Sequence, residues 1–387
     1  MKSNPRVGPL AAPPTTAPAL DVDRLLDDPE TRIIVCCGSG GVGKTTTSAS
    51  LALRAAERGR KVVVLTIDPA RRLAQSMGIE QLDNTPRPVQ DVRGGSLDAM
   101  MLDMKRTFDE VVLAQASPEK AKQILENPFY IALSSSFAGT QEYMAMEKLG
   151  QLHREGRYDL IVVDTPPSRS ALDFLDAPDR LSSFLDGRFV RLMLAPARGP
   201  AKLMSAGFGL ITHTLTKILG GQVLTDLQTF VAALDTVFGG FRQRAQQTYA
   251  LLQAHGTAFL VVAAPEQDAL REAAYFVERL SGDRMPLAGL IVNRATTAPA
   301  GDLSAAGALA AAERLKESGD AASTTGLTAG LLRLHADRVK LVERERQLRD
   351  RFCAAHPRVP TAVVPALPGD VHDLDGLREV SRLLAEA

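Results

Sequence analysis

The sequence predicts an α/β fold with a mainly parallel sheet and an inserted helical subdomain. Short apolar runs alternate with helical patterns along most of the chain, which favours right-handed βαβ crossovers. The first of these runs leads directly into a glycine-rich stretch. A long block from Leu181 to Ala254 shows helical patterns without intervening strands. The alternation predicts the sheet, and the uninterrupted block predicts the insertion.

Seven apolar, β-branched runs are the expected strands. They are residues 32–37, 61–67, 97–102, 158–163, 259–263, 287–292 and 361–364. Residues 45–58 follow the first run with small and aliphatic residues at helical spacing, as expected of a crossover helix. Ligands of open parallel sheets bind beyond the carboxyl ends of the strands. Gly38, Asp68, Asp164 and Asn293 all fall at such ends.

Composition limits the classes of function open to this chain of 387 residues. Lysine plus arginine and aspartate plus glutamate both number 45, so no nucleic-acid partner is expected through bulk electrostatics. Three cysteines are too few for a disulfide framework or a C-x-x-C metal site, which indicates a reducing compartment. No apolar run is long enough for a transmembrane segment. We therefore expect a cytoplasmic protein.

The stretch GSGGVGKT, residues 38–45, matches the pattern G-x-x-x-x-G-K-[ST] of a phosphate-binding P-loop. Its glycines let backbone N–H groups turn toward a phosphate at the start of a helix. The residues expected to contact nucleotide are Gly38, Gly40, Gly41, Val42, Gly43, Lys44, Thr45 and Thr46. Lys44 can reach the β- and γ-phosphates, Thr45 can bind Mg²⁺, and Thr46 can contact the α-phosphate. ATP and Mg²⁺ are thus the expected cofactors.

Asp68 ends the second strand in TIDPARRLAQSMG and has two interpretations. An Asp followed by Pro is a common start of a helix, which would make the residue a structural cap. A strand-end acid beside a P-loop can also orient or deprotonate the water that attacks the γ-phosphate. We favour the catalytic interpretation.

Two further strand ends carry polar side chains. Asp164 ends DLIVVD, the form of a Walker B motif, and is expected to hold Mg²⁺ through a water, although an Asp before Thr165-Pro166 also suits a turn. Asn293 closes GLIVNR, where its amide can bind an adenine edge or serve as an ordinary turn residue.

Together GSGGVGKTT, TIDPA, VVDTPPSRSALDFL, IVNR and VPALPGDVHDL resemble, in order, the motifs of the ArsA/GET family of deviant-Walker ATPases. The resemblance runs from about Arg32 to the end of the chain and is greatest to a bacterial subfamily often encoded beside a paralogue. It implies ATP hydrolysis by a nucleotide-gated dimer whose two sites face each other. It also implies that Asp68 is the switch I catalytic acid, that Asp164 is the switch II residue, and that Asn293 and the Pro365 loop line the adenine pocket.

Three departures from the family pattern change these expectations. The signature lysine, which reaches across the dimer to the phosphates of the other subunit, is replaced by Ser39. Cys36 and Cys37 lie under the P-loop and Cys353 is isolated, so arsenite transport is not expected. The C-x-x-C pair that clamps the targeting dimer through zinc is absent from the sequence.

Ser39 allows two explanations. A small residue fits a tight loop, and the lysine was lost together with activity. Alternatively, a paralogous subunit supplies the lysine to this chain's site in a heterodimer, so a homodimer would be slow. We favour the second explanation.

The motifs and composition suggest a division of the chain. The expected parts are a disordered leader (1–29), the first part of the P-loop ATPase domain (30–104), a helical insertion (105–135), the ATPase domain with switch II (136–180), a helical subdomain (181–255) and the adenine-side part (256–387), with a mobile loop at 296–330 that contains one helix. Residues 333–351 form a charged, largely exposed helix in this prediction.

The helical subdomain raises the question of a client. Its apolar stripes are Met204, Phe208, Ile211, Leu215 and Ile218, then Leu224, Leu227, Val231, Leu234 and Phe238. Stripes at this spacing more often form a core than a groove. The function hypotheses are therefore a nucleotide-gated ATPase for a hydrophobic client, a regulatory or pump-associated subunit with a membrane-protein partner, and a nucleotide-binding scaffold with little hydrolysis.

Overall fold

The computed structural model describes residues 17–68, 72–128, 130, 131, 134, 140–166, 240, 243–297, 302–318 and 324–387. Eight strands in these residues form one sheet in the order β3-β4-β2-β5-β1-β6-β7-β8. They are β1 (Ile33–Cys37), β2 (Lys61–Thr66), β3 (Arg87–Pro88), β4 (Ser96–Met101), β5 (Leu160–Asp164), β6 (Thr257–Ala263), β7 (Leu287–Ala295) and β8 (Thr361–Pro365). Every pairing is parallel except that of β3 with β4. The predicted α/β fold with a mainly parallel sheet is confirmed.

The seven predicted strands are all present, with boundaries that differ from the prediction by at most three residues. The edge strand β3 was not predicted, because two exposed residues, one of them a proline, carry no strand pattern. The central strands were easy to predict because β1, β5 and β6 are buried along their whole length.

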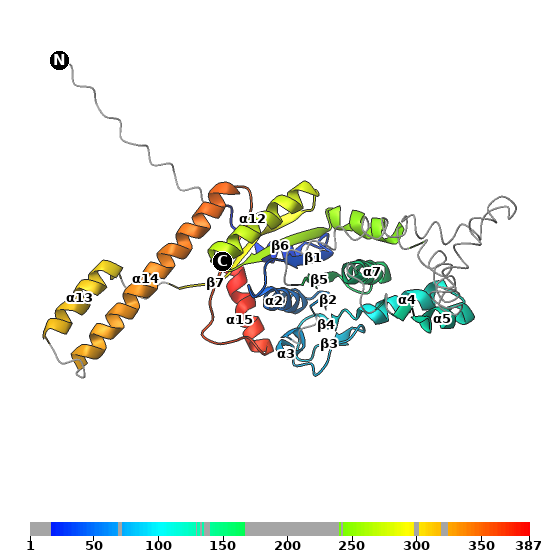
Figure 1. Cartoon of the computed structure of the whole chain (residues 1–387), viewed down its shortest axis with the longest axis horizontal. Helices are drawn as coiled ribbons and strands as arrows, with labels where there is room; N and C mark the ends of the chain where they lie inside the picture. The colour runs from blue at the N-terminus through cyan, green and yellow to red at the C-terminus, as the bar shows by residue number, and fades with distance from the viewer. Residues whose placement is uncertain are drawn as a thin grey trace, which may run out of the picture.

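Helices cover both faces of the sheet (Figure 1). One face carries α2 (Lys44–Glu57), the crossover between β1 and β2, and α15 (Leu374–Ala385), which packs beside it. The other face carries α12 (Gln267–Gly282), which connects β6 to β7 and contacts both. The short helix α3 (Arg72–Ser76) follows β2 and contacts α2. The carboxyl ends of β1, β2, β5 and β7 thus meet at one edge.

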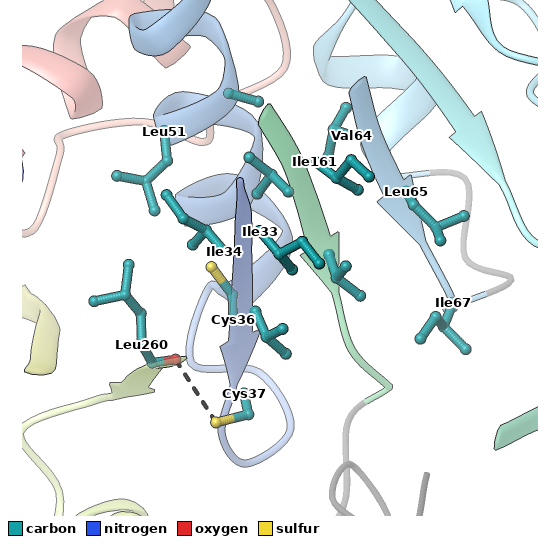
Figure 2. Close-up of a cluster of buried hydrophobic side chains, with 14 of the residues drawn as sticks. Ile33, Ile34, Cys36, Cys37, Leu51, Val64, Leu65, Ile67, Ile161 and Leu260 are labelled. Carbon is teal, nitrogen blue, oxygen red and sulfur yellow. Dashed lines mark hydrogen bonds between the residues drawn. The ribbon is translucent and has the colours of Figure 1, made fainter. Parts of the chain in front are cut away.

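The first strand forms a rigid base for the loop that follows it (Figure 2). Ile33, Ile34 and Cys36 are fully buried there, among side chains of β2, β5 and α2. The Sγ atom of Cys37 donates to the carbonyl of Leu260 on β6, at 3.7 Å. Burial raises the pKa of the Cys36 thiol to about 12, so this cysteine is a packing residue.

The disordered leader expected at residues 1–29 is wrong for residues 17–29. Helix α1 (Val22–Asp27) buries Val22 and Leu26 against the domain. Asp23 on α1 accepts from Arg54 on α2, with 2.5 Å between Oδ1 and Nε. Six residues are too short for a helical pattern to stand out, and the partners of this helix lie on a distant segment. Residues 1–16 lie outside the described residues.

The mobile loop expected at residues 296–330 is also revised. The helix inside it is α13 (Ala305–Ser318), but its last residues begin α14 (Thr324–Ala355), which extends the charged helix expected at 333–351. The two helices pack as a hairpin beyond β7 (Figure 1). Several of the alanines that suggested a loop, Ala308, Ala312, Ala329 and Ala336, are buried in this hairpin, and alanine has the highest helix propensity.

The helical insertion expected at 105–135 contains α4 (Met104–Gln115) and α5 (Pro118–Leu125). Asp103 caps α4, and the Ser117-Pro118 pair separates the helices. A further helix, α7 (Thr140–Glu155), packs against α4. Both apolar stripes of the expected helical subdomain lie outside the described residues. Among the described helices, none is long and apolar enough to cross a membrane.

Candidate functional site

A cavity of about 860 Å³ opens at the carboxyl edge of the sheet. Its lining includes eight residues that the sequence predicted: Gly41, Gly43, Lys44, Thr45, Thr46, Asp68, Asn293 and Pro365. Gly38, Gly40, Val42 and Asp164 belong to the same loop or strand ends but do not line the cavity. The structure therefore brings together side chains from segments that are more than 300 residues apart.

Two P-loop positions require glycine because of close contacts. A Cβ atom at Gly38 would lie 2.1 Å from the carbonyl oxygen of Val262 on β6. Gly43 has φ 91°, and a Cβ atom there would lie 2.3 Å from Nδ2 of Asn293. Both contacts hold the loop against neighbouring strands, so the first and last glycines of the motif fix its position.

The Lys44 side chain is buried at the start of α2, with its ammonium turned into the loop. Its Nζ atom donates to the carbonyl oxygen of Ser39 at 2.7 Å. Burial lowers the pKa of Lys44, and the nearby carboxylates of Asp164 and Asp68 oppose that shift. An anion bound in the cavity would compensate this buried charge as the two carboxylates do.

Asp164 lies at the centre of a buried polar network. Its Oδ2 accepts from the hydroxyls of Thr45, at 2.8 Å, and Thr66, at 2.9 Å. Its Oδ1 is buried and has no hydrogen-bond partner among the described residues. Burial raises the pKa of this carboxyl to about 6, and the two hydroxyls and Lys44 act in the opposite direction. An unpartnered buried oxygen is costly unless a water, an ion or a ligand supplies its partner.

The end of β7 holds the P-loop from the side. Nδ2 of Asn293 donates to the carbonyl of Val42 at 2.9 Å, which uses one of its two amide hydrogens. The next residue, Arg294, has a positive φ of 61° and donates to the carbonyl of Gly41 at 3.0 Å. The predicted base-contact residue therefore also positions the loop. Its amide oxygen can still accept a hydrogen bond from a base.

Asp68 lines the cavity directly after β2. Its backbone N–H donates to the Thr66 hydroxyl at 3.2 Å, the same hydroxyl that donates to Asp164. One threonine thus joins the two strand-end acids. Residues 69–71, which would follow a helix cap, lie outside the described residues.

The sequence prediction missed several lining residues. They are Arg72, Gln75, Ser76, Arg294 and Val380, whereas Val364 and Ala366 to His372 belong to the Pro365 loop that the family resemblance implied for the adenine pocket. Arg72 sits one turn beyond Asp68 in TIDPARR, and a basic residue so close to a predicted phosphate site was an available signal. The contribution of Val380 from α15 depends on tertiary packing and carries no local signal.

Ser39 adds no positively charged side chain to the site. Ser39 contributes its carbonyl to Lys44 and is itself partly exposed. Lys44, Arg72 and Arg294 are the Lys and Arg residues among the described lining of the cavity. No group of three or more His, Cys, Asp and Glu side chains suited to a metal ion occurs within the described segments. A metal ion here would therefore depend on hydroxyl, carboxylate and ligand oxygens.

Comparisons with known proteins bear on the family to which the chain belongs. The model of the family described as "Anion-transporting ATPase" matches residues 31–314. The chain is 32% identical over 176 residues to ATPase GET3 of Malassezia globosa, covering 45% of this chain and 49% of the relative. It is 26% identical over 275 residues to ATPase GET3 of Podospora anserina, covering 70% and 75%.

A third relative is the putative arsenical pump-driving ATPase of Halobacterium salinarum, 29% identical over 192 residues, with 46% of this chain and 28% of the relative covered. The chain thus spans about half of the Malassezia globosa relative's length, 28% of the Halobacterium salinarum relative and 75% of the Podospora anserina relative. The family model, in contrast, extends over most of the chain and includes the P-loop and all four strand-end residues. This chain belongs to the anion-transporting ATPase family.

Proposed function

We propose that the chain binds MgATP in the cavity at the sheet edge and hydrolyses it. The observation that carries this proposal is Asp164, which is buried, joined to Thr45 and Thr66, and left with one unpartnered oxygen. A P-loop threonine beside a strand-end carboxylate is the donor set that P-loop ATPases use for Mg²⁺. The relatives named ATPase support the same reaction.

The residues present fit a magnesium ion. Thr45 offers a hydroxyl and Asp164 a carboxylate, which are the oxygen donors that Mg²⁺ prefers, with the carboxylate acting through a water. Mg²⁺, when bound, neutralises charge on the β- and γ-phosphates. When nucleotide binds, the Lys44 ammonium would leave the Ser39 carbonyl and donate to these phosphates instead.

The remaining residues have assigned parts in this proposal. Asp68 orients the attacking water or takes its proton, and its place in the cavity lining supports that role. In the strand order of the sheet, Asn293 on β7 and Pro365 on β8 lie on the opposite side of β1 from Asp68, and they bind the adenine base. Backbone N–H groups of residues 40–46 bind the phosphates.

Completion of the site by another chain forms the second part of the proposal. Ser39 cannot supply the positive charge of the signature lysine. A paralogous subunit that retains the lysine would provide it across a nucleotide-gated heterodimer. A charge aimed at the transferring phosphoryl group accelerates hydrolysis by about 10³-fold or more in related cases. The dimer then couples nucleotide state to a hydrophobic client or a membrane-protein partner.

The alternative function is nucleotide binding with little hydrolysis. Without a cation at position 39, a homodimer of this chain would bind nucleotide and hydrolyse little, as expected of a scaffold or a regulatory, pump-associated subunit. The same turnover measurement separates the alternatives.

The test is ATP turnover by the purified chain, by its paralogue, and by their mixture. Lys44→Ala in this chain, and the equivalent change in the paralogue, assign the activity of the mixture to one site. We expect a gain of at least tenfold on mixing that Lys44→Ala in this chain removes. Full activity alone, with no gain on mixing, would refute the heterodimer. ATP binding with no hydrolysis in any mixture would favour the scaffold.

A further inference from the structure

Strand β7 carries one extra residue near its end, beside the P-loop. The paired residues Val292 and Ala295 of β7 are three apart in the chain, whereas their partners on β8, Val363 and Pro365, are two apart. The strand therefore contains a β-bulge at residues 293–294. Bulges re-aim side chains and are over-represented next to functional sites, and both residues of this one contact the P-loop.

Arg294 within the bulge has a backbone conformation that residues with side chains rarely adopt. Its φ is 61°, in the left-handed region that favours glycine. Among the described residues, Arg284 and Asp91 also have a positive φ, but Arg284 follows the last turn of α12 and Asp91 lies in a turn. Left-handed residues are common at such places. Arg294 lies inside a strand, so its strain has a different cause.

The bulge brings two successive side chains to the same loop. In a regular strand, neighbouring side chains point to opposite faces of the sheet. Here Nδ2 of Asn293 donates to the carbonyl of Val42 at 2.9 Å. Nη1 of Arg294 donates to the carbonyl of Gly41 at 3.0 Å. The left-handed conformation of Arg294 thus lets the end of β7 bind two successive carbonyls of the P-loop.

These two hydrogen bonds also fix the direction of two N–H groups. The C=O and N–H of a trans peptide lie in one plane and point in opposite directions, and no cis peptide occurs in the described residues. The Gly41 carbonyl shares its peptide with the N–H of Val42, and the Val42 carbonyl shares its peptide with the N–H of Gly43. Because both carbonyls face β7, both N–H groups point away from it.

We propose that Arg294 is a positioning residue that presets the N–H groups of Val42 and Gly43 for phosphate before nucleotide binds. Both groups belong to the P-loop segment proposed to bind the phosphates, so this inference rests on the proposed function. Donors that already point at their ligand need no reorganisation when it binds, which raises the affinity. The strained backbone of Arg294 is retained because it holds these donors in place.

A direct contact between Arg294 and phosphate is the competing explanation, because this exposed arginine also lines the cavity. In that case the guanidinium would leave the Gly41 carbonyl when the ligand binds, and the ligand-free P-loop would not depend on it. The hydrogen bond to Gly41, and the bulge that permits it, favour positioning. A positioning residue orders the loop in the ligand-free chain, which separates the two explanations.

The first measurement is NMR relaxation of the backbone amides in the full chain without nucleotide. Arg294→Ala removes the guanidinium, so the order parameters of Val42 and Gly43 should fall. The matched control is Arg284→Ala, which changes the same residue type in the same left-handed conformation and should leave both order parameters unchanged. Arg294→Gly also removes the guanidinium but relieves the strain, so it should fold even where the alanine variant does not and should give the same fall.

The second measurement compares ligands with and without a base. Calorimetric titrations with ADP and with inorganic pyrophosphate should show the same loss of affinity in both Arg294 variants. The expected loss is about tenfold for each ligand, which is the usual contribution of a hydrogen bond from a charged donor. Arg284→Ala should bind both ligands as the wild type does.

Four results would overturn the proposal. Order parameters that stay unchanged while ADP binding weakens would show a direct contact with phosphate. A loss confined to ADP, with pyrophosphate binding unchanged, would place the effect at the base. Undiminished ADP binding in both Arg294 variants would remove the role of Arg294 and leave the proposed function intact. A wild-type chain that binds neither ligand would instead refute the proposed function, and with it any role for Arg294 in phosphate binding.

Discussion

The nucleotide cavity and the α13–α14 hairpin depart in opposite ways from the usual burial of apolar and exposure of charged side chains. Beside the cavity a carboxylate, Asp164, is fully buried, and one of its oxygens has no partner among the described residues. On the hairpin, leucines such as Leu327 and Leu334 are two-thirds exposed. Each placement lowers the stability of the isolated chain, because buried charges and exposed apolar groups both prefer the other environment. The buried carboxylate fits the polar ligand proposed above, and the exposed leucines leave apolar surface on the hairpin.

The largest expected effect concerns Lys44. Lys44→Ala removes the buried ammonium next to the Ser39 carbonyl and should lower ATP turnover by about 10²–10³-fold or more. The measurement is steady-state hydrolysis, in the most active mixture found. The matched control is Lys105→Ala, which removes an exposed lysine paired with Asp109 on α4. Equal turnover of wild type and Lys44→Ala would place the chemistry elsewhere.

A second effect separates backbone strain from close contact. Gly43→Ala and Gly59→Ala both force alanine into positive φ, and each should lose about 1–2 kcal/mol of unfolding free energy. Only Gly43→Ala also pushes against Asn293, so it should lose more stability and weaken ATP binding. Denaturant unfolding and calorimetric titration check both. Equal losses in the two variants would mean that the P-loop moves freely away from β7.

The pH dependence of magnesium binding follows from the pKa of Asp164, which is raised to about 6. Below that pH the carboxyl holds a proton with which Mg²⁺ must compete. The magnesium-dependent part of ATP affinity should therefore fall up to about tenfold per pH unit below 6. Titrations with and without Mg²⁺ separate this effect from protonation of ATP itself. Asp164→Asn should show no such dependence.

The smallest effect belongs to the hairpin. Leu331→Ala truncates an exposed side chain and should change the unfolding free energy of the monomer by less than about 0.5 kcal/mol. Ala336→Leu enlarges a buried residue opposite and should cost about 1–3 kcal/mol. Thermal unfolding at low protein concentration checks the pair. A large loss in Leu331→Ala would show that the Leu331 side chain packs within its own chain.

The sequence predicted the parts of the site that depend on local pattern. The P-loop, the strand ends at Asp68 and Asp164, and Asn293 stand directly after runs whose strand character was clear. The tie between Asn293 and Val42 could not be predicted, because it joins segments 251 residues apart. Local pattern likewise missed α1, whose contacts are on α2, and assigned the first residues of α14 to a loop. Small residues suit both a loop and a close helix pair, and only tertiary contact distinguishes the two.

The most direct measurement is thermal unfolding of wild type and Asp164→Asn, each with and without MgATP. Folding raises the pKa of Asp164 from 3.8 to about 6. Ionisation of this carboxyl therefore destabilises the folded chain. The stability is fully present at low pH and is lost as the pH rises through this window. At pH 7.5 Asp164→Asn should therefore stabilise the ligand-free chain by about 2–3 kcal/mol, and the gain should vanish below pH 4.

The same variant should lose most of the stabilisation that MgATP gives to the wild type, because its amide replaces a carboxylate needed for magnesium. A less stable ligand-free Asp164→Asn, together with an undiminished MgATP shift, would contradict the claim that this buried carboxylate is retained for a magnesium-bound nucleotide.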